Sequence, residues 1–398
     1  MITDSPRSQK KKWSDSTLSI RTANQPSANR EHSTALYLNS GFYFDDSEYA
    51  RAVFANEIAG HKYGRYHNPN ADEFVAKVCA LEAMPSGIAM ASGMGAIFTA
   101  FMALLSKGDH MIASRAVFGS TFQLLNQLLR WGIEVTLVDG KNNQAWEQAV
   151  RSNTRLCYLE TPSNPGLELV DLTFLGRLCN QQEIILMVDN IFATPILQKP
   201  AHYGADLVMH SATKFFDGQG RCLGGVVVGK TAWIDKIQQF NRHVGCTLSA
   251  FNAWIFSKSI ETLAVRINKH CANALCIAEF LQQHSRVCQV YYPHLPSHPQ
   301  YALAKQQMSA GGALVTFVLD DQKQARQCMD HLQMLSISAN LGDTRTIITH
   351  PASTTHSSLT QEQRLETGVV DALLRISVGL EDVDDIIGDL DQALNQIH

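Results

Sequence analysis

Residues 207–214 read LVMHSATK, an apolar run that ends on hydroxyl groups and Lys214. Upstream, residues 186–190 read LMVDN, a second apolar run that ends on Asp189 and Asn190. Short apolar runs of this kind are typical of strands that are covered on both faces of a parallel sheet. The sequence therefore predicts a lysine and an aspartate at the carboxyl ends of two strands, about one β-α-β unit apart.

The same alternation of helical stretches and short apolar runs extends from residue 72 to residue 229. Glycines punctuate the connections between them, and several runs are apolar on both faces, which indicates a doubly wound α/β domain with a mostly parallel sheet. The predicted strands are Ile88–Ala91, His110–Ala113, Glu134–Val138, Leu156–Glu160, Ile184–Asp189, Leu207–His210 and Gly225–Val228.

The C-terminal part of the chain has a different pattern. Residues Phe251 to Leu281 are rich in alanine, leucine and isoleucine and predict one long connecting helix. The strands predicted after it suit a smaller α+β domain on an antiparallel sheet, and they are Val287–Tyr292, Ala313–Leu319, Leu335–Ser338 and Leu374–Val378. We expect an N-terminal arm over 1–60, a large domain over 61–255 and a C-terminal domain over 256–398.

Bulk properties exclude several classes of protein. The net charge of -4 over 398 residues leaves no basic footprint for nucleic acid, and no run is apolar enough to span a membrane. Residues 1–33 are polar and lack a signal-peptide segment, so we expect a loosely ordered arm in a cytoplasmic protein. The nine cysteines are odd in number and form no CxxC pair, which favours reduced thiols that pack as small apolar groups.

A lysine and an aspartate at strand ends are what pyridoxal phosphate requires of a protein. Lys214 would form the Schiff base, and Asp189 would keep the pyridine nitrogen protonated so that the ring accepts electrons. Plainer readings exist, since Lys214 could be a surface lysine and Asp189 a loop carboxylate. The apolar run before Lys214 argues against a surface position.

A phosphate group also needs hydroxyls and backbone N–H groups at the start of a helix. The segment after the first predicted strand reads ASGMGA over 91–96 and opens a helix, so Gly93 and Met94 are suited to this task. Ser211 and Thr213 would supply hydroxyls. Taken alone, a Ser-Gly pair before a helix is more simply an N-cap.

Further positions suit an amino-acid substrate and an aromatic ring. Phe118 follows the next strand and could stack on the ring, although a lone aromatic is more often core. Asn164 could hydrogen-bond the phenolic oxygen of the ring or cap a turn. Arg375 interrupts an apolar strand, where it would either bind the substrate carboxylate or form a structural salt bridge.

Other patterns in the chain are weaker. Residues 218–224 are glycine-rich but lack the spacing of a dinucleotide fingerprint. His294 and His298 lie in a proline-rich stretch without a third ligand, so we expect a solvated loop and no metal site.

Taken together, the chain from residue 37 onward resembles the cystathionine γ-synthase-like enzymes of cysteine and methionine metabolism, which have the fold-type I pyridoxal phosphate architecture. The shared motifs are YGRYHNP (63–69), ASGM (91–94), ETPSNP (160–165), VDN (188–190), SATK (211–214) and NAW (252–254). The resemblance implies that Tyr63 and Arg65 reach the phosphate of a neighbouring subunit. It therefore implies shared active sites in a dimer, usually within a homotetramer.

Within the family the chain is most similar to the O-succinylhomoserine sulfhydrylases, through VFGST (117–121), KFFDGQGR (214–221) and SISANLGDT (336–344). This implies γ-replacement on an O-acylhomoserine by sulfide, in which Arg375 binds the α-carboxylate and Asn340 assists it. Most relatives carry tyrosine where this chain has Phe118, so Lys214 must carry more of the proton transfer. Cystathionine formation from cysteine, γ-elimination as in methionine or cystathionine γ-lyases, and a non-catalytic protein that binds pyridoxal phosphate remain alternatives.

Overall fold

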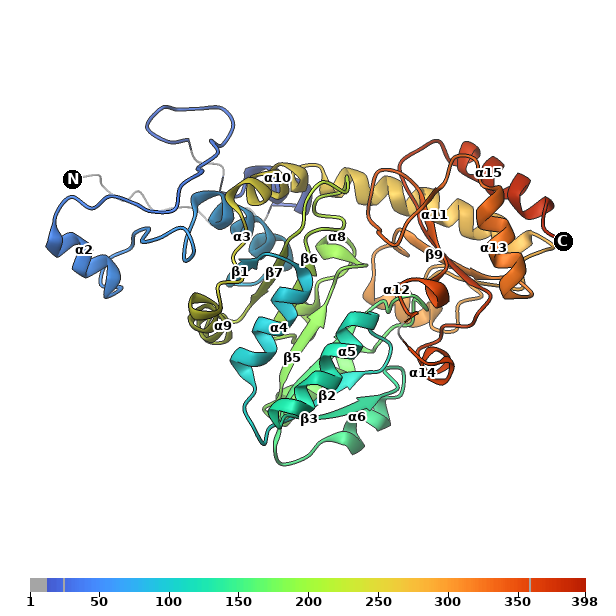
Figure 1. The fold of residues 1–398 in the computed structure, drawn as a ribbon, viewed down its shortest axis with the longest axis horizontal. Helices are drawn as coiled ribbons and strands as arrows, with labels where there is room; N and C mark the ends of the chain where they lie inside the picture. Colours follow the sequence, from blue (N-terminus) through green and yellow to red (C-terminus); the bar gives the residue numbers. More distant parts are fainter. Residues whose placement is uncertain (1–12, 24–25, 358) are drawn as a thin grey trace.

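The computed structural model describes residues 13–23, 26–357 and 359–398, which form two sheets with helices around them. Figure 1 shows the larger sheet in the middle of the molecule and the smaller sheet beside the C-terminus, with the long helix α11 (Leu263–Gln283) running between them. The fold is thus mixed α/β, with a large, mostly parallel central sheet, as the sequence predicts.

The larger sheet has seven strands in the order β1-β7-β6-β5-β4-β2-β3. The strands β6, β5, β4, β2 and β3 are parallel to one another, whereas β7 is antiparallel to both β6 and β1. All seven predicted strands are confirmed within two residues, and their bounds are β1 Ser86–Met90, β2 His110–Ser114, β3 Glu134–Val138, β4 Thr154–Glu160, β5 Ile185–Asp189, β6 Leu207–Ser211 and β7 Gly225–Gly229.

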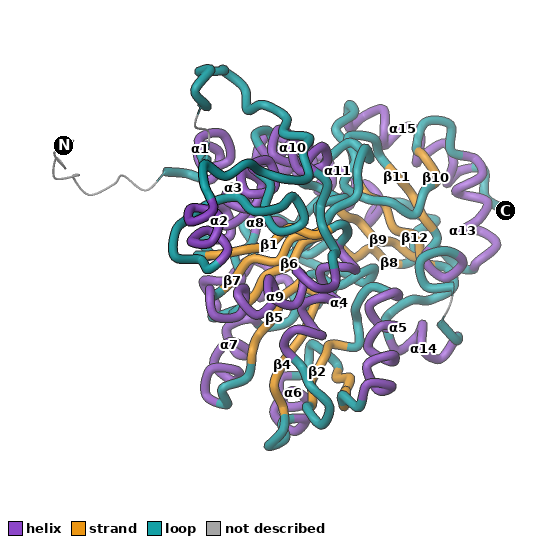
Figure 2. Tube along the Cα trace, turned by 60° about the vertical axis from the view of Figure 1, so that its left-hand side comes forward, coloured by secondary structure: helices purple, strands orange, loops and turns teal. Residues whose placement is uncertain are grey.

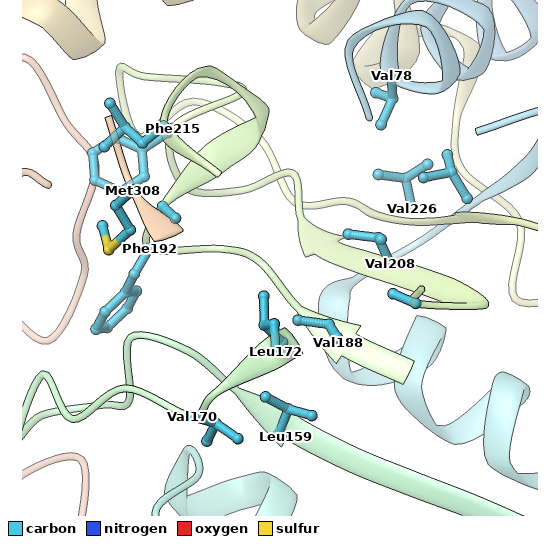
Figure 3. Packing of buried hydrophobic residues seen from close by; sticks show 14 of the residues in the cluster. Val78, Leu159, Val170, Leu172, Val188, Phe192, Val208, Phe215, Val226 and Met308 are labelled. Atoms are coloured by element: carbon cyan, nitrogen blue, oxygen red, sulfur yellow. The ribbon is translucent and has the colours of Figure 1, made fainter. Parts of the chain in front are cut away.

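Helices cover both faces of this sheet because successive strand residues point to opposite sides. On β5, Leu186 and Val188 enter one buried cluster, and Ile185 and Met187 enter another. Figure 3 shows Val188, packed beside residues of the neighbouring strands, in the first cluster. The helices that contribute to the first cluster are α3 (Pro69–Glu82), α6 (Asn143–Ala149), α7 (Leu172–Gln181), α8 (Thr194–Leu197), α10 (Ala250–Ile260) and α11. The helices that contribute to the second cluster, on the other face, are α4 (Gly93–Leu104), α5 (Gly119–Leu128) and α9 (Thr231–Val244).

The expectation of a single helix from Phe251 to Leu281 is wrong, because the helix is interrupted at residues 261–262, between α10 and α11. At the break, the carbonyl of Ser259 accepts hydrogen bonds from the Thr262 hydroxyl at 3.1 Å and from Arg266 Nη2 at 3.0 Å. These side chains take the place of the regular helical ladder, which explains why the apolar periodicity continues through the break.

The smaller sheet has five strands in the order β10-β11-β12-β9-β8, with bounds β8 Gln289–Tyr291, β9 Leu314–Val318, β10 Ser336–Ile337, β11 Ile347–Thr349 and β12 Leu373–Ser377. The four predicted strands are present, whereas β11 was not predicted. The sheet is antiparallel except for β10 and β11, which are parallel. The helices α13 (Gln322–His331) and α15 (Val383–Asn395) pack together and, with α12 (Tyr301–Gln307) and α14 (Gln361–Glu366), complete this part of the chain.

The N-terminal segment departs partly from the expectation of a loosely ordered arm over 1–33. Residues 1–12 and 24–25 lie outside the described residues, but Asp15–Arg21 forms the helix α1, which contacts α3 and α11. Leu18 packs against the core, and Asp15 forms a 2.6 Å ion pair with Lys199. Residues Ser47–Phe54 form α2, beyond the edge strand β1 in Figure 2. Among the described residues, no helix has both the length and the apolarity that a membrane crossing needs.

Candidate active site

A cavity lies where the carboxyl ends of the central strands face the loops of the smaller sheet. Its wall contains most of the predicted site residues, which are Gly93, Met94, Phe118, Asn164, Asp189, Ser211, Thr213, Lys214 and Arg375. Asn340 lines the adjoining mouth, together with Lys214. The structure thus gathers residues that are up to 282 positions apart in the sequence, from Gly93 to Arg375.

Lys214 is placed by the turn that follows β6, where its N–H donates to the carbonyl of Ser211 at 3.1 Å. Its Nζ donates to Oδ1 of Asn340 at 2.7 Å. Burial, and then the charge of Arg375, lower the pKa of Lys214 to about 8. A larger fraction of this amine is therefore neutral near pH 8 than for an exposed lysine, and a neutral amine can act as a nucleophile or a base.

Asp189 is the last residue of β5 and is buried beneath the cavity. The Tyr158 hydroxyl donates to its Oδ2 at 3.3 Å, and the N–H of Ile191 donates to its Oδ1 at 3.1 Å. Burial raises the pKa of Asp189 to about 7, although these hydrogen bonds oppose the shift. A protonated ring nitrogen in the cavity would favour the ionised form, so the carboxyl group fits the pyridinium of pyridoxal phosphate.

The start of α4 forms a concave wall beside β6. Ser92 is the N-cap of α4, because its Oγ accepts the N–H of Gly95 at 3.0 Å, and this cap leaves the N–H groups of Gly93 and Met94 available. The N–H groups of Gly93 and Met94 have no hydrogen-bond acceptor among the residues that the structure describes, and both residues line the cavity. A Cβ atom on Gly93 would lie 2.7 Å from Cβ of Ser211. The cradle therefore suits a phosphate group and needs glycine at this position.

The two predicted hydroxyls, those of Ser211 and Thr213, differ in the hydrogen bonds that they form within the described chain. Ser211 ends β6 next to Gly93 and lines the cavity. Thr213 also lines the cavity, but its Oγ1 accepts the N–H of Gly224 at 3.1 Å and lies 3.3 Å from the Gly224 carbonyl oxygen. Since one hydroxyl oxygen accepts more than one hydrogen bond, Thr213 retains capacity toward a ligand.

Arg375 lies within β12 and is 1% exposed. Its Nη1 donates to Oδ1 of Asn164 at 2.9 Å, and its Nη2 donates to the carbonyl of Asn340 at 3.2 Å. No carboxylate of the described chain forms an ion pair with this guanidinium, and its Nε has no partner there. The structural salt bridge considered from the sequence is thus wrong, and the uncompensated cation fits the carboxylate of an amino acid.

Glu160 is a cavity residue to which the sequence analysis gave no role. It ends β4, is 3% exposed, and accepts the N–H of Phe118 through Oε2 at 3.0 Å. Burial and the neighbouring charge of Asp189 raise the pKa of Glu160 well above its ordinary range. A usable signal was present, since Glu160 stands at the end of an apolar strand, as Asp189 does.

Tyr63 and Arg65 are not in the cavity of their own chain. They lie between α2 and α3, where Tyr63 is 45% exposed and the Arg65 guanidinium lies 4.8 Å from the ring centre of Tyr66. Arg65 also donates from Nη1 to the carbonyl of Arg242. The single chain therefore leaves the predicted contact of these residues with a phosphate untested.

The loop with His294 and His298 is packed rather than solvated, so that expectation is wrong. His298 is 5% exposed and accepts the N–H of Gln300 at 3.1 Å through Nδ1. Tyr292 and Leu295 anchor the loop in the core of the smaller sheet. Within the described ranges, no cluster of three histidine, cysteine or acidic side chains could hold a metal ion.

Comparison with known proteins identifies the family to which the chain belongs. Residues 16–395 match the family described as Cys/Met metabolism PLP-dependent enzyme. An O-succinylhomoserine sulfhydrylase of Mycobacterium tuberculosis is 43% identical over 96% of each chain. Another from Pseudomonas aeruginosa is 44% identical, over 95% of this chain and 94% of the relative. An L-methionine gamma-lyase of Fusobacterium nucleatum is 42% identical, over 91% of this chain and 93% of the relative.

A solved structure from Campylobacter jejuni has the same fold. It superposes with a TM-score of 0.93 at 32% identity, over 96% of this chain and all of the other, and it contains N'-pyridoxyl-lysine-5'-monophosphate. The cofactor in that protein is thus attached to a lysine, which is the chemistry that the sequence predicts for Lys214 in this chain.

Proposed function

The chain belongs to the Cys/Met metabolism family of pyridoxal phosphate-dependent enzymes, and from this premise we propose that it replaces the γ-substituent of an O-acylhomoserine with sulfide. The product is homocysteine, and the most suitable ester is O-succinylhomoserine, as the names of the relatives at 43% and 44% identity suggest. The observation that carries the proposal is a single cavity in which Lys214 and Asp189 face an uncompensated Arg375.

Each part of the cofactor has a matching group in the cavity. Lys214 would hold the cofactor at its aldehyde carbon, Asp189 would pair with the ring nitrogen, and Phe118 would stack on the ring. Gly93, Met94, Ser211 and Thr213 would hold the phosphate, and Asn164, which lines the same cavity, would hydrogen-bond the phenolic oxygen of the ring. When bound, pyridoxal phosphate supplies a carbonyl carbon that reacts with amines and a ring that accepts electrons from the substrate.

Arg375 orients the amino acid by its α-carboxylate. The guanidinium is held by Asn164 Oδ1 and the Asn340 carbonyl, so its position is fixed before the substrate arrives. A planar fork of donors on a rigid strand gives a bidentate contact of defined direction. The α-carbon of the substrate would thereby be placed toward Lys214, which lies beside Asn340 at the mouth of the cavity.

Lys214 moves the protons. With a pKa of about 8, its neutral amine accepts the proton of the substrate α-carbon, passes it to the former aldehyde carbon of the cofactor, and, neutral once more, accepts a proton of the β-carbon. The acyl group leaves from the γ-carbon as a carboxylate that takes the C–O bonding pair. A hydrosulfide ion adds its own electron pair at the γ-carbon, and Lys214 returns the protons to the β- and α-carbons. Phe118 has no ionisable group, so Lys214 carries both transfers.

The related γ-lyase at 42% identity makes γ-elimination the second candidate. The two outcomes share every step up to loss of the γ-substituent and differ in whether a thiol or water then enters. Cystathionine formation differs in the same way, with cysteine as the thiol. A non-catalytic role is disfavoured because the lysine, aspartate and arginine that the chemistry needs all face one cavity.

We also propose that the enzyme acts in the cytoplasm as a homotetramer built from two dimers. Tyr63 and Arg65 then reach the phosphate bound by the adjacent subunit. Their position outside the cavity of their own chain and the exposure of Tyr63 support this.

The decisive experiment offers purified enzyme O-succinylhomoserine or O-acetylhomoserine, each with sulfide or with cysteine, and in a separate assay methionine alone. We expect the highest kcat/KM for homocysteine from the succinyl ester and sulfide. Formation of 2-oxobutanoate from methionine at a comparable rate would support the lyase instead. If cystathionine formed faster than homocysteine at equal thiol concentrations, the proposed nucleophile would be wrong.

A further inference from the structure

Glu160 differs from the other buried glutamates of the described chain, because it has no basic partner. Glu73 forms an ion pair with Lys77 at 3.0 Å, and Glu82 lies 2.6 Å from Nε2 of His210. Glu160 is equally buried, yet its one hydrogen bond within the described chain is that from the Phe118 N–H to its Oε2. A buried carboxyl group without a cation is far cheaper to keep neutral than ionised.

A second carboxyl group lies directly beside it. Glu160 and Asp189 are paired across β4 and β5, so their side chains leave the same face of the sheet about 4.8 Å apart at the backbone. Asp189 receives two donors, from Tyr158 and Ile191, whereas Glu160 receives one. Since two adjacent buried carboxylates are costly to ionise together, the group with fewer donors keeps the proton.

The groups that act on Glu160 come from three elements. They are Asp189 on β5, the N–H of Phe118 before α5, and Arg375 on β12, whose charge favours the ionised form. The guanidinium of Arg375 makes its hydrogen bonds to Asn164 and Asn340 and not to Glu160. The cation therefore acts on Glu160 only through space.

We propose that Glu160 is a positioning residue that works as a neutral acid, fixing the main chain of Phe118 while leaving the charge of Arg375 free for the substrate. This inference rests on the proposed function for its substrate class. The hydrogen bond holds the residue from which α5 begins, and so sets the direction of the Phe118 ring. An ionised Glu160 would instead compete with the α-carboxylate of the amino acid for Arg375.

Infrared difference spectroscopy tests the protonation directly and needs no substrate. The holoenzyme is compared with its Glu160→Gln variant at pH 7, where the protonated ring nitrogen that pairs with Asp189 favours the ionised form of this aspartate. We expect the C=O stretch of a protonated carboxylic acid in the wild type and its loss in the variant. Absence of the band, or its persistence in Glu160→Gln, overturns the inference. Glu73→Gln is the matched control and must leave the band in place, since Glu73 is paired with Lys77.

Turnover then separates a positioning role from a charged one. We expect Glu160→Gln to lower kcat by about threefold, because an amide oxygen still accepts the Phe118 N–H, and Glu160→Ala by about 100-fold, because Phe118 loses its anchor. Equal losses in the two variants would mean that the charge is needed and would refute the neutral acid. Affinity for L-alanine, which binds through Arg375 but has no leaving group, is measured from the visible spectrum of the cofactor. This affinity does not depend on which thiol the enzyme uses, so a failure of the inference about Glu160 can be told apart from a failure of the proposed reaction.

Discussion

Nζ of Lys214 lies 2.7 Å from Oδ1 of Asn340, so the lysine that follows β6 of the larger sheet is held by the loop between β10 and β11 of the smaller one. The main-chain carbonyl of the same asparagine accepts a hydrogen bond from Arg375. One residue thus contacts both the amine that moves protons and the cation that binds the substrate. The site is completed only when the two sheets are packed together.

Asn340→Ala should weaken amino-acid binding without releasing the cofactor. The variant loses one side-chain hydrogen bond but keeps the main-chain carbonyl that holds Arg375, so we expect KM for the ester to rise by about tenfold or less. The measurement is initial-rate kinetics, with the visible absorbance reporting bound cofactor. Asn340→Ser, which has a hydroxyl at this position, should have a KM between those of the wild type and Asn340→Ala. An unaltered KM in Asn340→Ala would show that the side chain has no part in binding.

Asp189→Ala should bind the cofactor and lose turnover. Without the carboxylate the ring nitrogen is no longer held protonated, and we expect kcat to fall by about 1,000-fold. Asp206→Asn serves as control, because Asp206 precedes the same strand, β6, but lies outside the cavity and should leave kcat as it is. Wild-type turnover in Asp189→Ala would remove the aspartate from the mechanism.

Much of this site is predictable from the sequence because its residues stand at the ends of apolar strands. In a sheet covered on both faces, Asp189 and Lys214 mark the points where the strands meet the ligand-binding edge. The same rule applies to Glu160, which went unassigned because the resemblance gave it no role. The role proposed for Glu160 rests on its having no ion pair within the described chain, and the absence of an ion pair is visible only in three dimensions.

Other features depend on contacts between distant segments. The break between α10 and α11 follows from the side chain of Arg266 bonding to the Ser259 carbonyl, so helical periodicity could not predict it. The strand β11 has only three residues, Ile347–Thr349, which is too short for a periodic signal. His298 is buried because Tyr292 and Leu295 anchor its loop, whereas its prolines suggested a solvated one.

Arg375→Ala should separate substrate binding from cofactor binding. Removing the buried cation leaves the substrate carboxylate unpaired in the cavity, so we expect KM to rise by about 100-fold while the visible absorbance of the cofactor persists. Arg375→Lys should recover only part of the loss, because an ammonium cannot form the bidentate contact. The role would be excluded by an unchanged KM in Arg375→Ala.

Lys214→Met should stabilise the cofactor-free protein at neutral pH. The pKa of Lys214 is about 8 in the folded chain against 10.5 ordinarily, so below pH 8 the folded state carries a half-buried ammonium. Between these values the unfolded chain binds more protons, and wild-type stability rises with pH by up to about 3 kcal/mol. The variant also loses the hydrogen bond to Asn340, which offsets part of this gain. We therefore expect Lys214→Met to be more stable than the wild type by about 2 kcal/mol at pH 7. The difference in stability should fade toward pH 10.

Urea unfolding of the cofactor-free proteins across this pH range measures the effect. Lys77→Met is the matched control, because Lys77 is buried but paired with Glu73 and Glu261 at 3.0 Å each. That substitution leaves carboxylates unpaired and should destabilise at every pH in the range. A destabilised Lys214→Met at pH 7 would contradict the lowered pKa of the lysine.

Arg65→Ala and Lys214→Ala subunits should restore activity when mixed, although each homo-oligomer is nearly inactive. If Arg65 serves the neighbouring cavity, a mixed dimer contains one cavity with both its own Lys214 and an intact Arg65 from the other chain. Random assortment then restores about a quarter of wild-type kcat. The control is a mixture of Asp189→Ala with Lys214→Ala: both residues line the cavity of one chain, so no mixed dimer gains an intact site. Equal activity in the two mixtures would place Arg65 outside the shared site.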